Sequence, residues 1–149
     1  MKKFNINWSD DSHSSKQQQL KDVGLFLMRL GAGAVMLFAH GSDKLVNFSS
    51  ISPGFPDPLG LGSTFSLILV VFAEFFCSLA IIFGIFTRYA AIPLFFNMLV
   101  AAFIVHNADP WARKELAIVF MIIFITLFFT GGGRYSIDMK LFKNKKFLI

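Results

Sequence analysis

Arg29 and Glu74 are the two charged residues that interrupt the long apolar stretches of this 149-residue chain. A charged side chain at bilayer depth is unfavourable by roughly 2.5 kcal/mol or more, unless it is paired or hydrated. We therefore expect Arg29 and Glu74 to form a buried ion pair. Such a pair serves either to fix the register of two helices or, because a carboxylate can exchange protons, to make Glu74 a proton carrier.

Two histidines close apolar runs, and each begins a His-x-x-Asp tetrad: His40 with Asp43, and His106 with Asp109. At this spacing an imidazole and a carboxylate can cap a helix end, relay a proton or hold a metal ion. We favour capping at the membrane surface, with proton handling by His40 as the alternative. Metal or haem ligation is the least favoured interpretation, and we predict no metal site.

Asn97 is a polar residue within the third apolar run, four positions after Pro93 and nine before His106. Nine residues correspond to about two and a half turns, so a straight helix directs Asn97 and His106 to opposite sides. A bend at Pro93 would change that geometry. We expect Asn97 to hydrogen-bond between helices, and we keep both Asn97 and His106 as candidate ligand-binding residues.

Four apolar runs must position these side chains, so the sequence predicts an all-α integral membrane protein built as a four-helix bundle. Hydrophobic residues make up 55% of the chain and charged residues 15%, against roughly 25% charged in ordinary soluble domains. All but the last run approach the roughly 20 residues that a bilayer requires. The expected spans are residues 23–40, 64–86, 89–106 and 116–130.

The distribution of Lys and Arg predicts the orientation of these spans. Ten lie beside the termini or in the turn after the second span, three lie on the opposite side, and Arg29 lies in the membrane. Both termini are therefore expected in the cytoplasm. The first group is Lys2, Lys3, Lys16, Lys21, Arg88, Arg134, Lys140, Lys143, Lys145 and Lys146, and the second is Lys44, Arg113 and Lys114.

The same distribution divides the chain into a membrane domain and two tails. Residues 1–22 are expected to be a polar tail without fixed structure, 23–138 the membrane domain and 139–149 a basic tail. The net charge of +5 arises from cations beside apolar segments. It therefore indicates a lipid bilayer as the partner, and no nucleic acid.

Small residues predict where the first two spans pack together. Gly33 shares one helical face with Arg29, Met36 and His40, because these positions recur at steps of three and four. The second span offers a matching stripe of small residues, comprising Ala73, Cys77, Ala80 and Gly84. We expect the two stripes to face each other.

Cys77 is the single cysteine, so the chain cannot form an internal disulfide or pass electrons through a thiol pair. The sequence also contains no phosphate-binding glycine loop, nucleophile elbow or zinc-protease motif. We therefore predict no resident cofactor from the residues themselves, and any electron donor must be a separate protein.

Three segments of this sequence resemble the DoxX family of small bacterial membrane proteins: RLGAGAVMLFAHGSDKL at 29–45, FAEFFCSLAIIFGIFTRYAA at 72–91 and ELAIVFMIIFITLFFTGGGRYSID at 115–138. The resemblance extends over residues 23–138. Its pattern positions are Arg29, Lys44, Glu74, Arg88 and Asp138. Arg88 and Asp138 are expected to pair near the cytoplasmic helix ends.

The resemblance implies a multi-pass protein of the bacterial inner membrane that is linked to quinone redox chemistry. Our leading hypothesis is a quinone-associated subunit with a headgroup pocket between the first two spans. Glu74 and His40 would handle protons, and the binding candidates are Arg29, Lys44, Asn97 and His106. Such a protein is at most an oxidoreductase subunit that needs an external electron partner.

Two other functions remain open at this point. A non-catalytic anchor would hold a soluble redox partner at the membrane through the basic tails. A transporter of a small solute is less favoured, because four spans are few for one protomer and a pathway would require a homo-oligomer.

Overall fold

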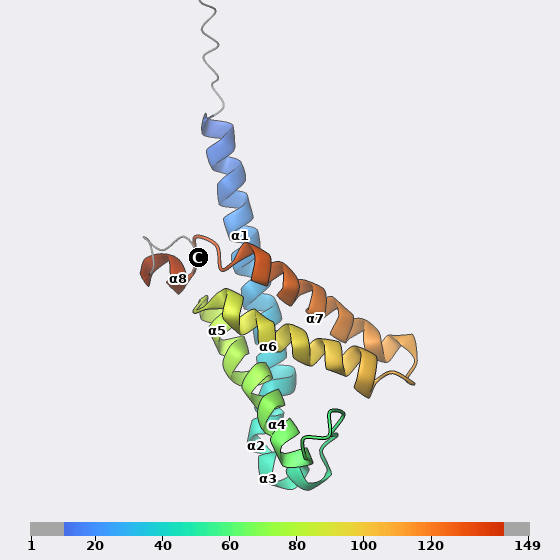
Figure 1. Ribbon diagram of the computed structural model, residues 1–149. Helices are drawn as coiled ribbons and strands as arrows, with labels where there is room; N and C mark the ends of the chain where they lie inside the picture. The colour runs from blue at the N-terminus through green and yellow to red at the C-terminus, as the bar shows by residue number, and fades with distance from the viewer. Residues whose placement is uncertain (1–10, 142–149) are drawn as a thin grey trace, which may run out of the picture.

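The computed structural model describes residues 11–141, and this part of the chain is helical and contains no β-strand, which confirms the all-α prediction (Figure 1). Several long helices change locally into π-helical turns, which are labelled η1, η3 and η4. The elements in order are α1 (Asp11–Met36), η1 (Leu37–Gly41), α2 (Ser42–Val46), α3 (Phe48–Ile51), the 3-10 helix η2 (Ser52–Gly54), α4 (Ser63–Val71), η3 (Phe72–Cys77), α5 (Ser78–Phe83), α6 (Thr87–Val100), η4 (Ala101–Val105), α7 (Trp111–Thr130) and α8 (Ile137–Leu141).

Three continuous helical stretches within residues 11–141 are long and apolar enough to cross a membrane: Ser15–Val46, Ser63–Phe83 and Thr87–Val105. They correspond to the first three predicted spans. The second ends before residue 86 because Gly84 follows it in the left-handed conformation, at φ 69°, which terminates the helix. The fourth long helix, α7, has 20 residues and a length of about 30 Å, and its first turns carry Arg113, Lys114 and Glu115.

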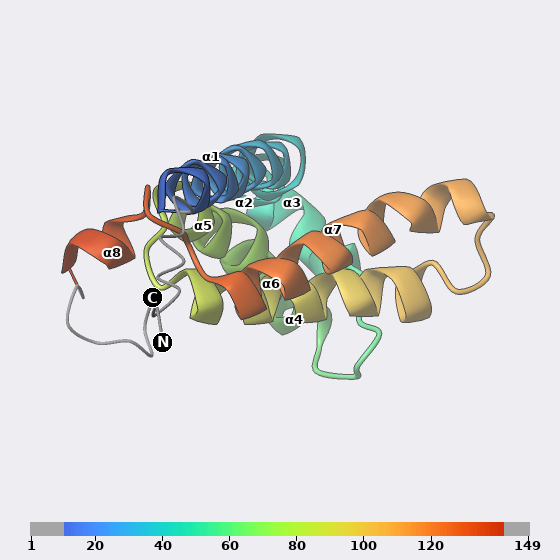
Figure 2. The same ribbon diagram turned by 90° about the horizontal axis from the view of Figure 1, so that it is seen from above.

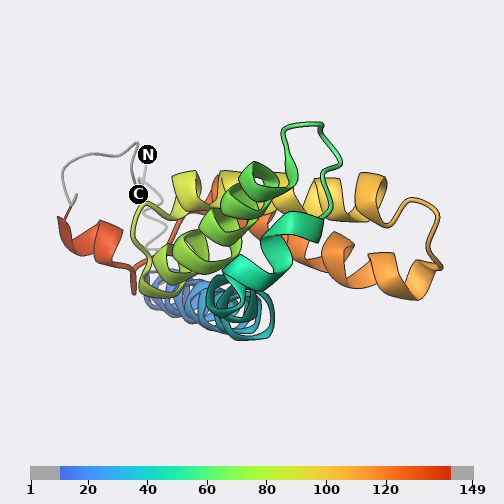
Figure 3. The same ribbon diagram turned by 90° about the horizontal axis from the view of Figure 1, so that it is seen from below.

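The helices are arranged as a long α1 crossing a hairpin of α6 and α7 (Figure 1). Viewed from above, α1 is seen nearly end-on while α6 and α7 run side by side (Figure 2). The α4–η3–α5 stretch lies between α1 and α6. Viewed from below, the connection between α3 and α4 projects as a loop beside α6 (Figure 3).

The helical structure begins earlier than predicted. Residues 1–10 lie outside the described residues, but α1 starts at Asp11, so the expectation of an unstructured tail is wrong for residues 11–22. Lys, Gln and Leu dominate residues 16–21, and these are strong helix formers that extend a helix already nucleated by the apolar run. The buried carboxylate of Asp22 also accepts a hydrogen bond from the backbone N–H of Arg134 at 3.1 Å. At the other end, α8 occupies 137–141, and residues 142–149 lie outside the described residues.

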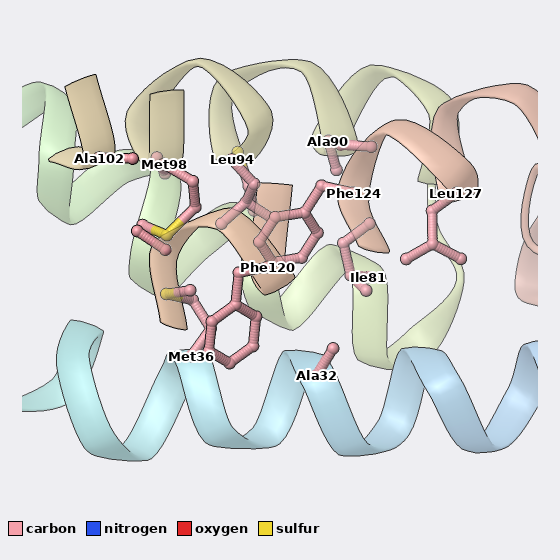
Figure 4. Packing of buried hydrophobic residues seen from close by; sticks show 14 residues of the cluster. Ala32, Met36, Ile81, Ala90, Leu94, Met98, Ala102, Phe120, Phe124 and Leu127 are labelled. Atoms are coloured by element: carbon pink, nitrogen blue, oxygen red, sulfur yellow. The ribbon is translucent and has the colours of Figure 1, made fainter. Parts of the chain in front are cut away.

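Gly33 allows α1 to approach the second span closely, but it faces Ser78 and Ile82 and not the predicted stripe of Ala73, Cys77, Ala80 and Gly84. A Cβ atom at Gly33 would lie 2.6 Å from Ile82 Cγ1 and 3.2 Å from the backbone oxygen of Ser78. Within a bilayer, such packing rather than hydrophobic burial holds helices together. Farther along, Ala32 and Met36 of α1 point toward Phe120 and residues of the other helices (Figure 4).

Candidate functional site

A cavity of about 230 Å³ collects five of the residues singled out by the sequence: His40, Lys44, Glu74, Asn97 and His106. They come from three of the long helical stretches, so only the folded chain brings them together. Apolar side chains complete the wall, including Met36, Val70, Met98 and Phe120. The predicted pocket is therefore wider than the space between the first two spans, because α6 and α7 also line it.

Glu74 is the central polar residue of this cavity. It is 5% exposed, and its two carboxylate oxygens have different partners. Lys44 Nζ lies 2.6 Å from Oε2, and Asn97 Nδ2 donates to Oε1 at 2.9 Å. Asn97 therefore makes the interhelical hydrogen bond that was predicted for it, and the acceptor is Glu74.

The predicted Arg29–Glu74 pair is wrong, because each residue has other partners. Lys44 supplies the cation for Glu74 from α2, one turn beyond His40. The sequence prediction considered only charges inside the apolar runs. Lys44 was therefore expected as a binding residue but not as the partner of Glu74, although its long side chain reaches back from the end of the first span into the membrane domain.

The π-helical turns coincide with the cavity residues. His40 lies within η1, Glu74 lies within η3, and His106 directly follows η4. A π-turn inserts an extra residue into a helix and rotates the residues after it, and such turns occur frequently at functional sites. In η4 the N–H of His106 bonds the oxygen of Ala101, five residues earlier, at 2.9 Å. This π-turn changes the phase between Asn97 and His106, so both line one cavity although a straight helix would separate them.

Gly41 explains how α1 and the second span meet beside Glu74. A Cβ atom at position 41 would lie 2.5 Å from the backbone oxygen of Glu74 and 2.8 Å from the nitrogen of Phe75. No other residue fits without moving a helix backbone. The close approach of η1 to η3 sets Lys44, three residues later, within reach of the Glu74 carboxylate.

The two His-x-x-Asp tetrads behave differently. His106 Nδ1 and Asp109 Oδ2 are 2.7 Å apart, so the second tetrad forms the predicted local contact at a helix end. This hydrogen bond is the main reason that the pKa of Asp109 lies below its ordinary value. In the first tetrad Asp43 instead accepts a hydrogen bond from Asn47. The imidazole of His40 has no hydrogen-bond partner among residues 11–141, so it is available to a molecule in the cavity.

The structure adds cavity residues that the sequence analysis passed over. Phe55, Pro56 and Pro58 of the loop between η2 and α4 lie over the cavity, and Arg113 approaches it from the start of α7. Arg113 Nη1 is 3.6 Å from Asp109 Oδ2. The i,i+4 spacing of Asp109 and Arg113 is a sequence signal that could have indicated their contact.

Arg29 lies outside the cavity lining, in a second polar cluster that joins helix ends. Its side chain is fully buried, and Nη1 donates to the backbone oxygens of Ile81 at 3.1 Å and Ile82 at 3.2 Å. Nη2 donates to the oxygen of Tyr135 at 2.8 Å. Arg29 thus binds carbonyls of the last turn of α5, where a cation also interacts favourably with the helix dipole. Its observed role is to join α1, α5 and the segment before α8.

Asp138 completes this second cluster and does not pair with Arg88 as predicted. Its carboxylate accepts hydrogen bonds from the N–H groups of Phe86 and Thr87, at 2.7 and 2.9 Å, and from the Thr87 hydroxyl at 3.1 Å. It therefore caps the start of α6, and satisfies backbone donors that have no partner within the helix. The Nε of Arg88 is buried without a hydrogen-bond partner in the described part of the chain.

These observations define a class of protein: a membrane protein that is helical over residues 11–141 and whose apolar helices enclose a small polar cavity. The DoxX family model matches residues 24–107, and the chain belongs to the DoxX family. This confirms the resemblance seen in the sequence.

The chain is also similar to three further proteins. An uncharacterized protein of Haemophilus influenzae is 33% identical over 119 residues, covering 74% of this chain and 85% of its own. The inner membrane protein YqjF of Escherichia coli is 31% identical over 135 residues, covering 87% and 98%. The uncharacterized membrane protein Rv3486 of Mycobacterium tuberculosis is 29% identical over 133 residues, covering 78% and 80%. No solved structure matches the chain.

Proposed function

We propose that this protein is a quinone-binding subunit of a membrane redox system and that the headgroup site is the Glu74 cavity. The observation that carries the proposal is the gathering of Lys44, Glu74, Asn97 and two histidines around one cavity between apolar helices. A buried carboxylate in such a place is unfavourable without partners, and residues of this kind in membrane helices commonly serve ligands or protons.

The cavity residues retain donors for a ligand after binding each other. A lysine ammonium has three N–H donors and an asparagine amide has two, and Glu74 accepts from one side-chain nitrogen of each. Lys44 and Asn97 therefore have further N–H groups to offer to a carbonyl oxygen. His40 adds an imidazole without a hydrogen-bond partner among the described residues. A quinone, with two carbonyl oxygens on an apolar ring, matches this combination of donors and apolar walls.

Proton supply is the second contribution of the chain to such chemistry. Reduction of a quinone to a quinol takes two electrons and two protons. The electrons must come from a separate redox protein. Glu74 and His40 are the groups of the cavity that can exchange protons with a bound headgroup, and His106 with Asp109 lies on the same wall.

The same proposal includes the membrane topology. We assign this chain to the inner membrane, with α7 as a fourth span and both termini in the cytoplasm. The excess of Lys and Arg at the termini supports this orientation. The Arg29 cluster then lies toward the cytoplasm and the Glu74 cavity toward the opposite face. A reporter enzyme that is active only outside the cytoplasm should be inactive when it is fused to the C-terminus. An active reporter would place the C-terminus outside the cytoplasm and contradict the proposed orientation.

Quinone content of the purified protein tests the proposed function. Wild type, Glu74→Gln and Glu115→Gln are purified in mild detergent, extracted with organic solvent and analysed by mass spectrometry. Glu115 is exposed and lies outside the cavity. Glu115→Gln is therefore the same chemical change at a position where we expect no effect on quinone binding. We expect near-stoichiometric quinone in wild type and Glu115→Gln, and several-fold less in Glu74→Gln. If the wild-type protein contains no more quinone than co-purified lipid carries, the proposed function is wrong, and an anchor or a transport role is favoured.

A further inference from the structure

A second cavity of about 250 Å³ lies beside the first, between the α4–η3 stretch and α6. Residues of both cavities include Pro58, Val70 and Asn97, so the two spaces adjoin across these side chains. The second cavity differs in chemistry, because its walls are almost entirely apolar. They include Leu69, Phe72, Ala73, Pro93, Phe96 and Val100.

The second cavity faces the lipid side of the helices. Phe72 and Phe96, one on each side of it, are 51% and 53% exposed, and Leu69 is 43% exposed. In a bilayer these side chains contact hydrocarbon. Ser66 and Asn97 bring polar side chains to the lining, and Ser66 already donates its hydroxyl to Asp57 at 2.8 Å. Asn97 is therefore the polar boundary between an apolar space and the Glu74 carboxylate.

We infer that this second cavity holds the hydrocarbon chain of the same ligand whose polar ring occupies the Glu74 cavity. The inference rests on the proposed function and specifies the substrate class: a single-chain amphiphile such as a prenylated quinone, which enters sideways from the bilayer. A water-soluble quinone without a hydrocarbon chain should be a poor substrate, because it makes no contact with the second cavity.

The sizes of the two cavities support one ligand shared between them. Ligand pockets typically measure roughly 300–1,000 Å³. At about 230 and 250 Å³ each cavity is smaller than this range, whereas the two together fall within it. Polar groups at one end and apolar walls at the other match an amphiphile oriented with its ring toward Glu74.

Ala73 has the smallest side chain of the residues that line the apolar cavity. Ala73 is buried beside Glu74 and presents only a methyl group. Pro93 lines the cavity from α6, where its ring leaves the helix without a backbone N–H at that position. Ala73 lines the second cavity and not the first, so we expect a larger side chain at position 73 to fill the space for the chain and to leave the Lys44–Glu74 contact in place.

Binding of matched quinones with and without a chain tests the inference. A chainless naphthoquinone and a chainless dimethoxybenzoquinone are each compared with their decyl derivatives, using the full-length protein in lipid nanodiscs and protein-free nanodiscs as the partition control. The variants are Ala73→Leu and, as the matched control, Ala39→Leu at an exposed alanine of η1. We expect the decyl chain to increase affinity at least tenfold in wild type and Ala39→Leu beyond partitioning. In Ala73→Leu this gain should fall below threefold while chainless binding stays within twofold.

The outcomes separate this inference from the proposed function. The inference is wrong if the decyl chain increases affinity equally in Ala73→Leu and wild type, or no more than partitioning alone explains. Either result leaves the proposed headgroup site unaffected. The absence of binding by every ring, with or without a chain, overturns the proposed function and this inference with it.

A labelling experiment on the wild-type protein covers the case in which Ala73→Leu does not fold. A decyl quinone with a diazirine at the chain end should label peptides containing residues 69–73 and 93–100, and excess unlabelled decyl quinone should suppress that labelling. Labelling confined to α1 or α7, or labelling that competitor does not reduce, means that bulk lipid rather than the ligand chain occupies the cavity.

Discussion

The Lys44–Glu74 contact predicts a measurable coupling between two positions that are 30 residues apart in sequence. Glu74→Gln removes the charge but keeps the side-chain size, and Lys44→Met removes the ammonium but keeps the apolar stem. The side chains are 22% and 6% exposed for Lys44 and Glu74. A hydrogen bond to a charged group contributes about 1.5–3 kcal/mol, and because Lys44 is partly hydrated we expect a coupling energy of about 2 kcal/mol.

The assay is a double-mutant cycle on the free energy of unfolding, measured by titrating purified protein in micelles with SDS. The cycle compares wild type, Lys44→Met, Glu74→Gln and the double variant. A second cycle pairs Glu74→Gln with Arg29→Lys, which keeps the charge of Arg29 but removes its forked geometry. Because Arg29 binds backbone carbonyls instead of Glu74, this second cycle should be additive within about 0.5 kcal/mol.

The two cycles together can refute the structural reasoning. A Lys44–Glu74 coupling below about 0.5 kcal/mol would mean that the contact does not form in solution. A coupling above about 1 kcal/mol between Arg29 and Glu74 would restore the ion pair that the sequence predicted and would contradict the separation of the two polar clusters.

Two further predictions concern backbone approach and pH. Gly41→Ala should lower the free energy of unfolding by about 1–3 kcal/mol, because the added Cβ meets the Glu74 carbonyl, whereas Gly31→Ala, with no neighbour within 4 Å, should be neutral or stabilising in the same SDS titration. Equal effects of the two variants would contradict the close helix approach. The pKa of Asp57 lies below its ordinary value, chiefly because Ser66 donates to the carboxylate. The stabilisation from Asp57 is therefore present above the unfolded-state pKa of about 4 and is lost as the pH falls through the lower folded-state pKa. The difference in thermal midpoint between wild type and Asp57→Asn should accordingly shrink from pH 7 to pH 3, and a difference that grows on acidification would reverse this sign.

The sequence predicted most of the polar cavity residues, because polar side chains in or beside apolar runs are few and unfavourable to bury. Glu74 and Asn97 interrupt such runs, and His40 and His106 end them. All four line one cavity together with Lys44. The chemistry of single residues was therefore readable from hydropathy alone, without knowledge of the fold.

Hydropathy did not predict which partners these charged side chains bind. Arg29 and Glu74 are the two charges within the apolar runs, yet Arg29 Nη1 donates to backbone carbonyls at a helix end, and Arg29 Nε is buried without a hydrogen-bond partner among the described residues. Free backbone carbonyl groups are present at the C-terminal end of every helix, and no residue type in the sequence indicates which of them accepts a hydrogen bond. The identity of the acceptor depends on Gly84, whose Cβ would lie 2.5 Å from Arg29 Nη1, and on a chain segment more than 100 residues away.

The π-helical turns were also beyond prediction from the sequence. Predictions from periodicity assume a constant rotation per residue. One inserted residue changes the direction in which all later side chains project from the helix. Asn97 and His106 are predicted on opposite sides by that assumption, but η4 places both on the cavity wall. The sequence allowed for a bend at Pro93, whereas the π-helical turn begins eight residues later, at Ala101.

The separation of the two polar clusters bears on why Glu74 is present at all. The Arg29 cluster joins α1, α5, α6 and the segment before α8, and thus provides cross-links between distant parts of the chain. The Glu74 cluster adds the Lys44–Glu74 contact between helices that Gly33 and Gly41 already bring together, and one hydrogen bond from Asn97 of α6. A buried ion pair is commonly no more stabilising than apolar residues of similar size. Packing therefore gives little reason for a carboxylate at position 74, whereas a ligand that needs nearby donors and protons gives a direct one.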